Sequence, residues 1–178
     1  MITRGVVAQI QLHWADATDE YFATVVRKNT PQFILDNAFN RHGMIAQSGI
    51  IYGVGPDAPT SPIYRPFDGI EIALTRQAIG SPDSERLPGA ALTLDQAIYG
   101  YTLGSAKLML MEDLIGSLEP GKKADIIVLD RDIHKQVEED VYELHETEVE
   151  MTFLGGKLIY EADDVSENLP DKRSSLFP

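Results

Sequence analysis

Cysteine is absent from this chain of 178 residues, which excludes disulfides, thiolate metal sites and cysteine nucleophiles together. Long apolar runs are also absent. No stretch approaches the ~18 apolar residues of a membrane helix, and the first five residues lack the apolar run of a signal peptide. Basic residues are few, 15 against 28 acidic ones, so the net charge is −13. Such a surface repels phosphate backbones and anionic lipids, and we expect a cytoplasmic protein that binds neither nucleic acid nor membrane.

The first half of the chain reads as a strand–helix–strand pattern. Residues 5–12 and 48–57 are short, mostly apolar runs of the kind found in strands buried on both faces. Between them, residues 16–28 resemble a helix or a long functional loop. Pro31 opens an amphipathic stretch in which Phe33, Ile34, Ala38 and Phe39 share one helical face. This order predicts a βα repeat with parallel strands.

The second half changes from helical to antiparallel β patterning. We predict a helix over residues 67–79, a polar loop over 80–89, and a helix capped by Thr93 with Gln96 at its third position and interrupted at Gly104. The strands follow: a turn and strand over 121–130, an alternating strand over 148–154, and a Gly155-Gly156 hairpin turn into 157–160. Residues 163–178 are a polar tail.

Three passages in this order are distinctive: residues 51–59 (IYGVGPDAP), residues 92–106, and residues 115–130 (IGSLEPGKKADIIVLD). Together they resemble the C-terminal part of the amidohydrolase family that includes N-substituted formamide deformylases. In that family a strand ends in Gly-Ser-Asp-Ala-Pro, and a later turn reads Gly-Ser-Leu-x-Pro-Gly-Lys-x-Ala-Asp. Residues 4–11 are also similar to the family's penultimate barrel strand, so the resemblance covers roughly positions 4–160.

The resemblance implies an α/β fold in two incomplete pieces. Residues 1–115 would supply the last two βα units of a (β/α)8 barrel, and residues 116–162 part of an antiparallel β-sandwich completed by strands from the family's N-terminus. Residues 163–178 would be the tail. A whole barrel needs ~200 residues or more, and only two buried parallel strands are found. We therefore expect a fragment, whether cloned so, proteolysed, or one part of a split gene.

Asp57 is the strongest site candidate. In the family the matching Asp, at the C-terminal end of the last barrel strand, binds a metal and takes a proton from the attacking water. A carboxylate suits both roles, because it is a hard ligand that also accepts a proton. The alternative is that Asp57 merely organises the turn after Gly55-Pro56. The family's usual serine is Pro56 here, which could alter the backbone approach to the metal.

The remaining metal ligands implied by the resemblance are not found in this chain. The family places a His-x-His pair, a bridging acid or modified lysine, and two further histidines on earlier strands. No His-x-His occurs here, and the four histidines are not at ligand spacing: His13, His42, His134 and His145. We therefore expect a divalent metal, zinc, in the complete enzyme and none bound by this fragment, because Asp57 alone cannot hold it tightly.

The substrate pocket would lie near the same strand ends. His13 follows the first strand and would contact the substrate with Trp14 as an apolar wall, or else be an exposed loop histidine. The loop 57–66 would cover the site, with Tyr64 and Arg65 shaping the pocket. Arg65 would pair with a substrate carboxylate, or else be an ordinary exposed arginine. The polar neighbours of the other histidines predict surface positions for them: His42, His134 and His145.

The most specific motif is interpreted structurally. Gly116 and Gly121 would provide turn geometry, and Asp125 would brace the turn by accepting hydrogen bonds from backbone donors. A phosphate-binding loop is excluded, because Gly-Lys-Lys leads here into a strand rather than a helix.

Two functions follow as expectations. The first is hydrolysis of a C–N bond in a small amide, formamide or cyclic amide by a metal-activated hydroxide, with no activity from this chain alone. The second is a non-catalytic module that docks on the missing N-terminal portion or self-associates as a homo-oligomer. A fragment of this kind must expose apolar edges, and pairing through residues 42–54 or swapping of the N-terminal segment would cover them.

Overall fold

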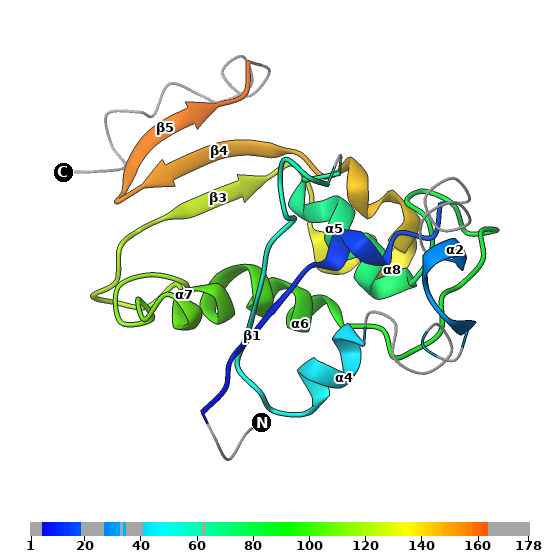
Figure 1. Cartoon of the computed structure of the whole chain (residues 1–178). Helices are drawn as coiled ribbons and strands as arrows, with labels where there is room; N and C mark the ends of the chain where they lie inside the picture. Colours follow the sequence, from blue (N-terminus) through cyan, green and yellow to red (C-terminus); the bar gives the residue numbers. More distant parts are fainter. Residues whose placement is uncertain (1–4, 19–26, 33, 35–40, 62, 164–178) are drawn as a thin grey trace.

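The computed structural model describes residues 5–18, 27–32, 34, 41–61 and 63–163. Their strands form a two-stranded and a three-stranded sheet (Figure 1). In the first sheet, β1 (Ala8–Ile10) pairs in parallel with β2 (Tyr52–Val54), with Gln9 opposite Gly53. The predicted parallel pairing is thereby confirmed. The strands are shorter than the apolar runs that predicted them.

Short helices connect this parallel pair. The 3-10 helix η2 (Leu12–Ala15) follows β1, the three-residue helix α2 (Arg27–Asn29) comes next, and α4 (His42–Gln47) precedes β2. Most of the stretches for which we predicted a helix or long loop, and then an amphipathic helix, lie outside the described residues.

The helix predicted over residues 67–79 is observed as α5 (Pro66–Thr75). It ends early because Arg76 adopts a left-handed backbone with φ of 62°, a conformation that costs a non-glycine residue about 1–2 kcal/mol. The buried Arg76 is held there by its carbonyl, which accepts the N–H of Leu87 at 2.8 Å, and by its guanidinium, which donates to the carbonyl of Pro88 at 2.7 Å. The chain then turns into the polar loop, as predicted.

The next helix, α6 (Leu94–Tyr99), begins with the predicted capping box. The Thr93 hydroxyl accepts the N–H of Gln96 at 3.2 Å, and the Gln96 side chain accepts the N–H of Thr93 at 3.0 Å. The prediction that Gly104 interrupts the helix is wrong. Instead a π-helical segment, η4 (Gly100–Gly104), continues into α7 (Ser105–Leu108), and Figure 1 shows α6 and α7 in one line.

The antiparallel sheet has the order β3 (Ile126–Leu129), β4 (Val149–Leu154), β5 (Lys157–Glu161). The predicted hairpin is confirmed: Gly155 and Gly156 have φ of 57° and 79°, both positive as a two-residue type I′ turn requires. Asp125 accepts the N–H of Gly155 at 2.7 Å. The predicted brace therefore exists, and it ties the turn before β3 to the hairpin between β4 and β5.

Two helical elements between β3 and β4 were not predicted. Asp132 caps α8 (Ile133–Glu139) and Asp140 caps the 3-10 helix η5 (Val141–Glu146) through their carboxylates. Both lie beside α5 in Figure 1, and Leu144 of η5 is fully buried in the same hydrophobic cluster as the parallel strands and α5. The C-terminal part of the chain therefore shares a core with the βα part.

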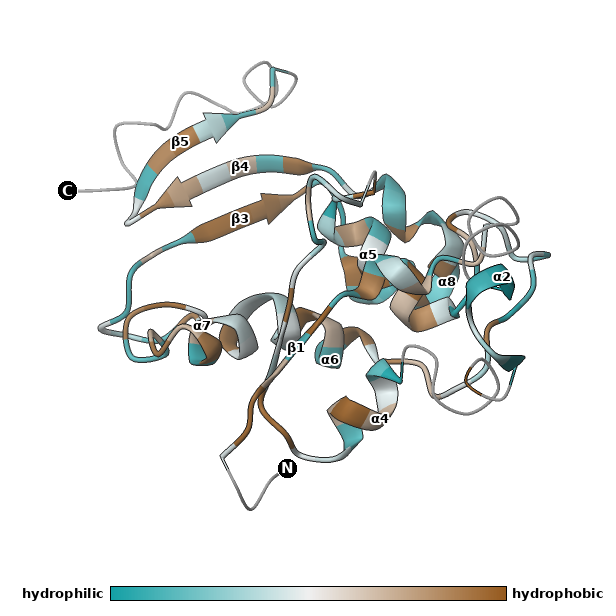
Figure 2. Ribbon diagram, viewed as in Figure 1, coloured by the Kyte–Doolittle hydropathy of each residue, from teal (hydrophilic) through white to brown (hydrophobic). Residues whose placement is uncertain are grey.

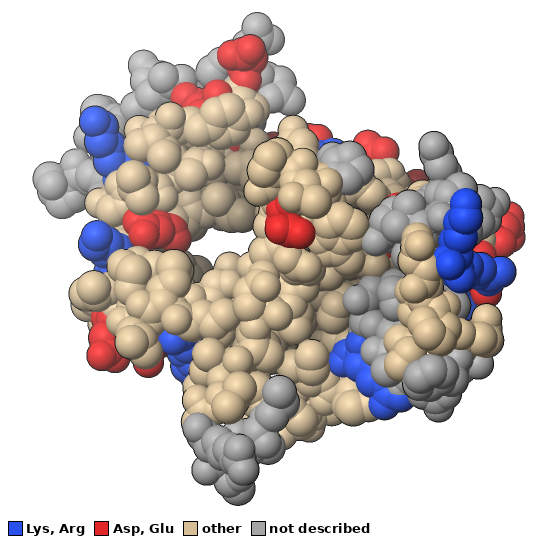
Figure 3. All heavy atoms as spheres, in the orientation of Figure 1, with Lys and Arg blue, Asp and Glu red and all other residues tan. Residues whose placement is uncertain are grey.

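The three-stranded sheet is much less covered than this core. Figure 2 shows apolar residues along its strands, and Ile127, Leu158, Ile159 and Tyr160 are 52%, 40%, 56% and 51% exposed. Figure 3 shows an opening between this sheet and the segment around α7. Within the described residues, no helix is long and apolar enough to cross a membrane.

Candidate functional site

Asp57 lies three residues beyond the C-terminal end of β2, on an exposed turn. Its backbone organises the turn: it adopts a φ of 62°, and its carbonyl accepts the N–H groups of Thr60 at 2.9 Å and Ser61 at 3.1 Å. Its carboxylate has no hydrogen bond or ion pair with any described residue. The two roles considered for Asp57 are therefore compatible, since the backbone makes the turn and the carboxylate is left available.

His13 is buried, with only 3% of its surface exposed, so the expectation of an exposed loop histidine is wrong. Its Nε2 lies 2.9 Å from the carbonyl oxygen of Arg65, next to the loop predicted to cover the site. Its Nδ1 and the hydroxyl of Tyr101 are both buried without partners among the described residues. A Cβ at Gly69 would lie 2.6 Å from the His13 ring and 2.7 Å from that hydroxyl. Gly69 thus lets both side chains approach α5.

Asp68 adds a carboxyl group to this region. Burial raises the pKa of Asp68, partly offset by the positive charge of Arg65 and by His13. Burial also raises the pKa of Tyr101 above its usual range, and Asp68 adds to that rise. His13, Asp68 and Tyr101 therefore form a partly buried polar cluster at the beginning of α5. Sequence reasoning missed Asp68 and Tyr101, although an acid in the first turn after the loop was a usable signal for Asp68.

Tyr64 and Arg65, the two residues predicted to shape the pocket, differ in their contacts. Tyr64 is 66% exposed and projects from the loop. The Arg65 guanidinium donates to the carboxylate of Glu148 at 2.7 Å and to the carbonyl of Thr147 at 3.2 Å. The Arg65–Glu148 pair is largely exposed, at 41% and 69%. Exposed pairs contribute only about 0–1 kcal/mol, so this pair holds the Arg65 guanidinium only weakly.

Trp14 lies in different surroundings. It lines a hollow of about 340 Å³ between β1 and α4, and none of the other predicted site residues lines it. The hollow includes His42, which is only 6% exposed, so its predicted surface position is wrong. The N-terminal turn of α4 lies tight against the chain, because a Cβ at Gly43 would overlap the carbonyl oxygen of Ala90. The helix that carries His42 is therefore packed closely against the segment that precedes α6.

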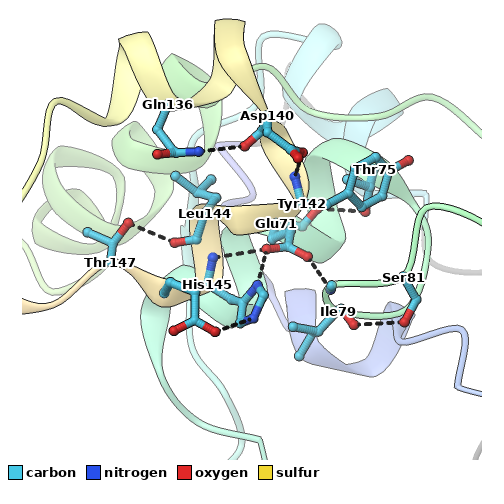
Figure 4. Close-up of polar contacts among 12 residues, drawn as sticks. Glu71, Thr75, Ile79, Ser81, Gln136, Asp140, Tyr142, Leu144, His145 and Thr147 are labelled. Carbon is cyan, nitrogen blue, oxygen red and sulfur yellow. Dashed lines mark hydrogen bonds and ion pairs between the residues drawn. The ribbon is translucent and has the colours of Figure 1, made fainter.

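His145, also predicted at the surface, is partly buried against α5. Figure 4 shows its imidazole and the Glu71 carboxylate pointing toward one another, with His145 Nδ1 2.8 Å from Glu71 Oε2. The same fully buried carboxylate accepts the backbone N–H of His145 at 2.9 Å and of Gly80 at 2.7 Å. The Glu71 carboxylate thus joins α5 to η5 and to the loop that follows α5. We therefore assign a structural role to the Glu71–His145 pair. His134 is exposed, as predicted.

A pH dependence of stability follows from the burial of His42. Burial, assisted by the charge of Arg76, lowers the pKa of His42 from 6.5 to about 4. Between these values the unfolded chain binds a proton that the folded chain does not, so stability is retained above pH 6.5 and declines as the pH falls toward 4. The decline attributable to this residue is about 3 kcal/mol. The free energy of unfolding would be measured with urea at several pH values in this range. The His42→Gln variant should not show this part of the decline, whereas the His134→Gln variant should show all of it. The same pH dependence of stability in the two variants would contradict the assignment.

The described residues do not form a metal site by themselves. No group of three or more His, Asp or Glu side chains among them is placed to hold a metal ion. A structural or catalytic zinc site takes three or four protein ligands, and Asp57 offers one. The exposed carboxylate of Asp57 therefore fits a metal only together with ligands from elsewhere.

The chain is similar to parts of longer known proteins. A 5-methylthioadenosine/S-adenosylhomocysteine deaminase of Symbiobacterium thermophilum is 32% identical over 65% of this chain and 27% of its own length. An N-substituted formamide deformylase of Arthrobacter pascens is 32% identical over 64% of this chain and 20% of its own length. This chain therefore spans about a fifth to a quarter of the length of these relatives.

A solved structure of an uncharacterized protein superposes with a TM-score of 0.54, at 18% identity, over 91% of this chain and 37% of that one. At this identity the likeness supports the fold alone. The family comparison is broader, because the model described as the amidohydrolase family matches residues 1–160. The chain belongs to the amidohydrolase family.

Proposed function

We propose that this chain supplies the C-terminal part of a metal-dependent active site that hydrolyses C–N bonds in small amides, formamides or cyclic amides. The observation that carries the proposal is the placement of Asp57. It follows the second of two parallel strands, and its carboxylate has no partner among the described residues, whereas its backbone fixes the turn. The names of the two relatives, a deaminase and a deformylase, are in accord with C–N chemistry.

In this proposal Asp57 is both a metal ligand and the group that accepts a proton from water. The metal, a divalent ion such as zinc, takes its other ligands from polypeptide outside the described residues. Because one carboxylate cannot assemble that site, the chain alone is inactive. Its natural partner is then the missing N-terminal portion of the hydrolase.

Substrate contacts are proposed for His13, Trp14, Tyr64 and Arg65. His13 and Arg65 lie next to each other, because the Arg65 carbonyl oxygen is 2.9 Å from the His13 ring. Arg65 would exchange its exposed pairing with Glu148 for an anionic group of the substrate. Tyr64 projects from the same loop and would contact the substrate there. Trp14 would act as an apolar wall from the separate hollow that it lines between β1 and α4.

A second candidate function is docking without catalysis. It is favoured by the exposed apolar residues of the three-stranded sheet, in which β5 pairs only with β4 among the described residues. Exposed strand edges and apolar faces are sites of association. The partner would be the missing N-terminal portion or a second copy of this chain.

Grafting tests the catalytic proposal. Residues 48–66 of this chain would replace the matching segment of the Arthrobacter pascens deformylase, and hydrolysis of its formamide substrate would be measured. We expect the graft to retain activity and Asp57→Asn in the graft to lower kcat/KM by about 100-fold or more. Pro56→Ser, which restores the family's residue, is the matched control and should not lower the rate. A folded graft in which Asp57→Asn is as active as its parent would refute the role of Asp57.

A further inference from the structure

The hollow between β1 and α4 is separate from the turn that carries Asp57. Its volume of about 340 Å³ is at the lower end of the range of small-molecule sites, roughly 300–1,000 Å³. Its walls come from β1, η2, and α4 with the residue before it: Gln9, Ile10, Gln11, Trp14, Arg41, His42 and Ile45. It contains neither Asp57 nor any member of the polar cluster at the beginning of α5.

His42 places a polar atom in this hollow that has no partner among the described residues. The His42 side chain is more than nine-tenths buried, and its Nδ1 makes no hydrogen bond in the described part of the chain. A buried polar atom without a partner is costly. The low pKa of His42, about 4 through burial, keeps the ring neutral near pH 7, so it presents one donor and one acceptor. Such a ring lining a hollow is a ready hydrogen-bonding group for a ligand.

Arg41 makes the hollow attractive to an anion. Within the described ranges its guanidinium forms no ion pair, and its hydrogen bond is a weak one to the sulfur of Met44 at 3.8 Å. The side-chain amide of Gln11 likewise has no partner there. The chain has 28 acidic residues, yet none of the described residues that line the hollow beside Arg41 carries a carboxylate. Guanidinium and amide donors together match the oxygens of a carboxylate.

The remaining walls are apolar. The indole of Trp14 and the side chain of Ile45 line the same hollow, and an indole face packs well against a planar ring. We propose that this hollow binds a small aromatic carboxylate, with the carboxylate on Arg41 and Gln11 and the ring against Trp14 and Ile45. The site needs neither a metal nor Asp57, and it shares only Trp14 with the substrate contacts proposed for the hydrolase.

The single tryptophan of the chain makes the test direct, because all tryptophan fluorescence comes from Trp14. The purified chain would be titrated with benzoate and with benzamide, a neutral molecule of nearly the same shape. We expect a saturable change with benzoate at a Kd of about 1 mM or tighter, and about tenfold weaker binding of benzamide. Benzamide separates charge recognition from simple occupation of an apolar space.

Variants assign the binding to the hollow. Arg41→Gln should weaken benzoate about tenfold and leave benzamide unchanged, and Gln11→Leu should weaken benzoate without removing the cation. Lys157→Gln is the matched control, because it removes one positive charge from β5, outside the hollow, and should change nothing. Circular dichroism of each variant checks that it is folded.

Three outcomes would overturn the proposal: equal affinity for benzoate and benzamide, no effect of either folded hollow variant, or no saturable change up to about 50 mM benzoate. The last would instead favour another polypeptide as the occupant. In the described part of the chain β1 pairs with β2 alone, so a strand adding to its other edge would cover the hollow.

Discussion

Replacing Gly104 by alanine is expected to lower the free energy of unfolding by about 3 kcal/mol or more, or to prevent folding. Gly104 ends the π-helical segment and lies directly on β2. A Cβ there would overlap the backbone oxygen of Tyr52 and lie 2.9 Å from the backbone oxygen of Tyr99. Neither oxygen belongs to a flexible side chain, so the helix must move away from the strand that leads to Asp57. Urea unfolding followed by circular dichroism measures the effect.

Thr102→Ala is the matched control for this glycine. Thr102 is exposed in the same π-helical segment, and among the described residues its hydroxyl donates a hydrogen bond only to the carbonyl of Ile98. Its replacement should change stability by less than about 1 kcal/mol. Alanine is favoured over glycine in helices by about 1 kcal/mol, so helix propensity would stabilise the Gly104 variant. A Gly104→Ala protein as stable as the parent would show that the helix does not lie this close to β2.

Replacing Glu71 by glutamine is expected to cost about 3 kcal/mol of stability. The Glu71 carboxylate is fully buried and accepts hydrogen bonds from the backbone N–H groups of Gly80 and His145, and pairs with the His145 ring. Glutamine keeps the volume but places an NH2 group against some of these donors, and the negative charge is lost. Chemical denaturation of the variant gives the loss directly.

Glu146 provides the comparison. Its carboxylate lies 3.0 Å from the other nitrogen of the His145 ring, but its side chain is 65% exposed. Glu146→Gln should therefore cost less than about 1 kcal/mol. If the two variants lost equal stability, the buried bonds of Glu71 would not be the link between α5 and η5 that Figure 4 indicates.

Local patterns in the sequence predicted most elements of this fold. The capping box at Thr93, the turn at Gly155-Gly156 and the parallel pairing of two apolar runs were all confirmed. Each depends on residues close in sequence or on strand connectivity alone. Turn and cap chemistry is decided by backbone geometry over a few residues, so a single sequence suffices to predict it.

Long-range packing could not be predicted in this way. Leu144 is fully buried although most of its neighbours in the sequence are polar or acidic. His42 is buried, and the next residue, Gly43, lies against the Ala90 carbonyl, nearly fifty residues away. Gly104 resembled a helix breaker, yet its lack of a side chain serves contact with β2. In each case the partner lies far along the chain, and nothing in the local pattern identifies it.

In the candidate site, too, one residue could be identified from the sequence, whereas contacts between distant segments could not. The family resemblance singled out Asp57, and the structure leaves its carboxylate available at the end of β2. The resemblance did not indicate that His13 would meet the Arg65 backbone, or that Trp14 would instead face a hollow with Arg41. Those contacts depend on how η2, α4 and α5 pack.

Elemental analysis of the chain purified without chelators tests most directly the claim that it holds only part of a hydrolase metal site. Metal and protein would be quantified in the same sample, before and after incubation with zinc. We expect less than about a tenth of an equivalent of zinc or any other transition metal, because the described residues do not place further ligands around Asp57. About one tightly bound equivalent would contradict it, because the chain would then assemble a complete metal site of its own.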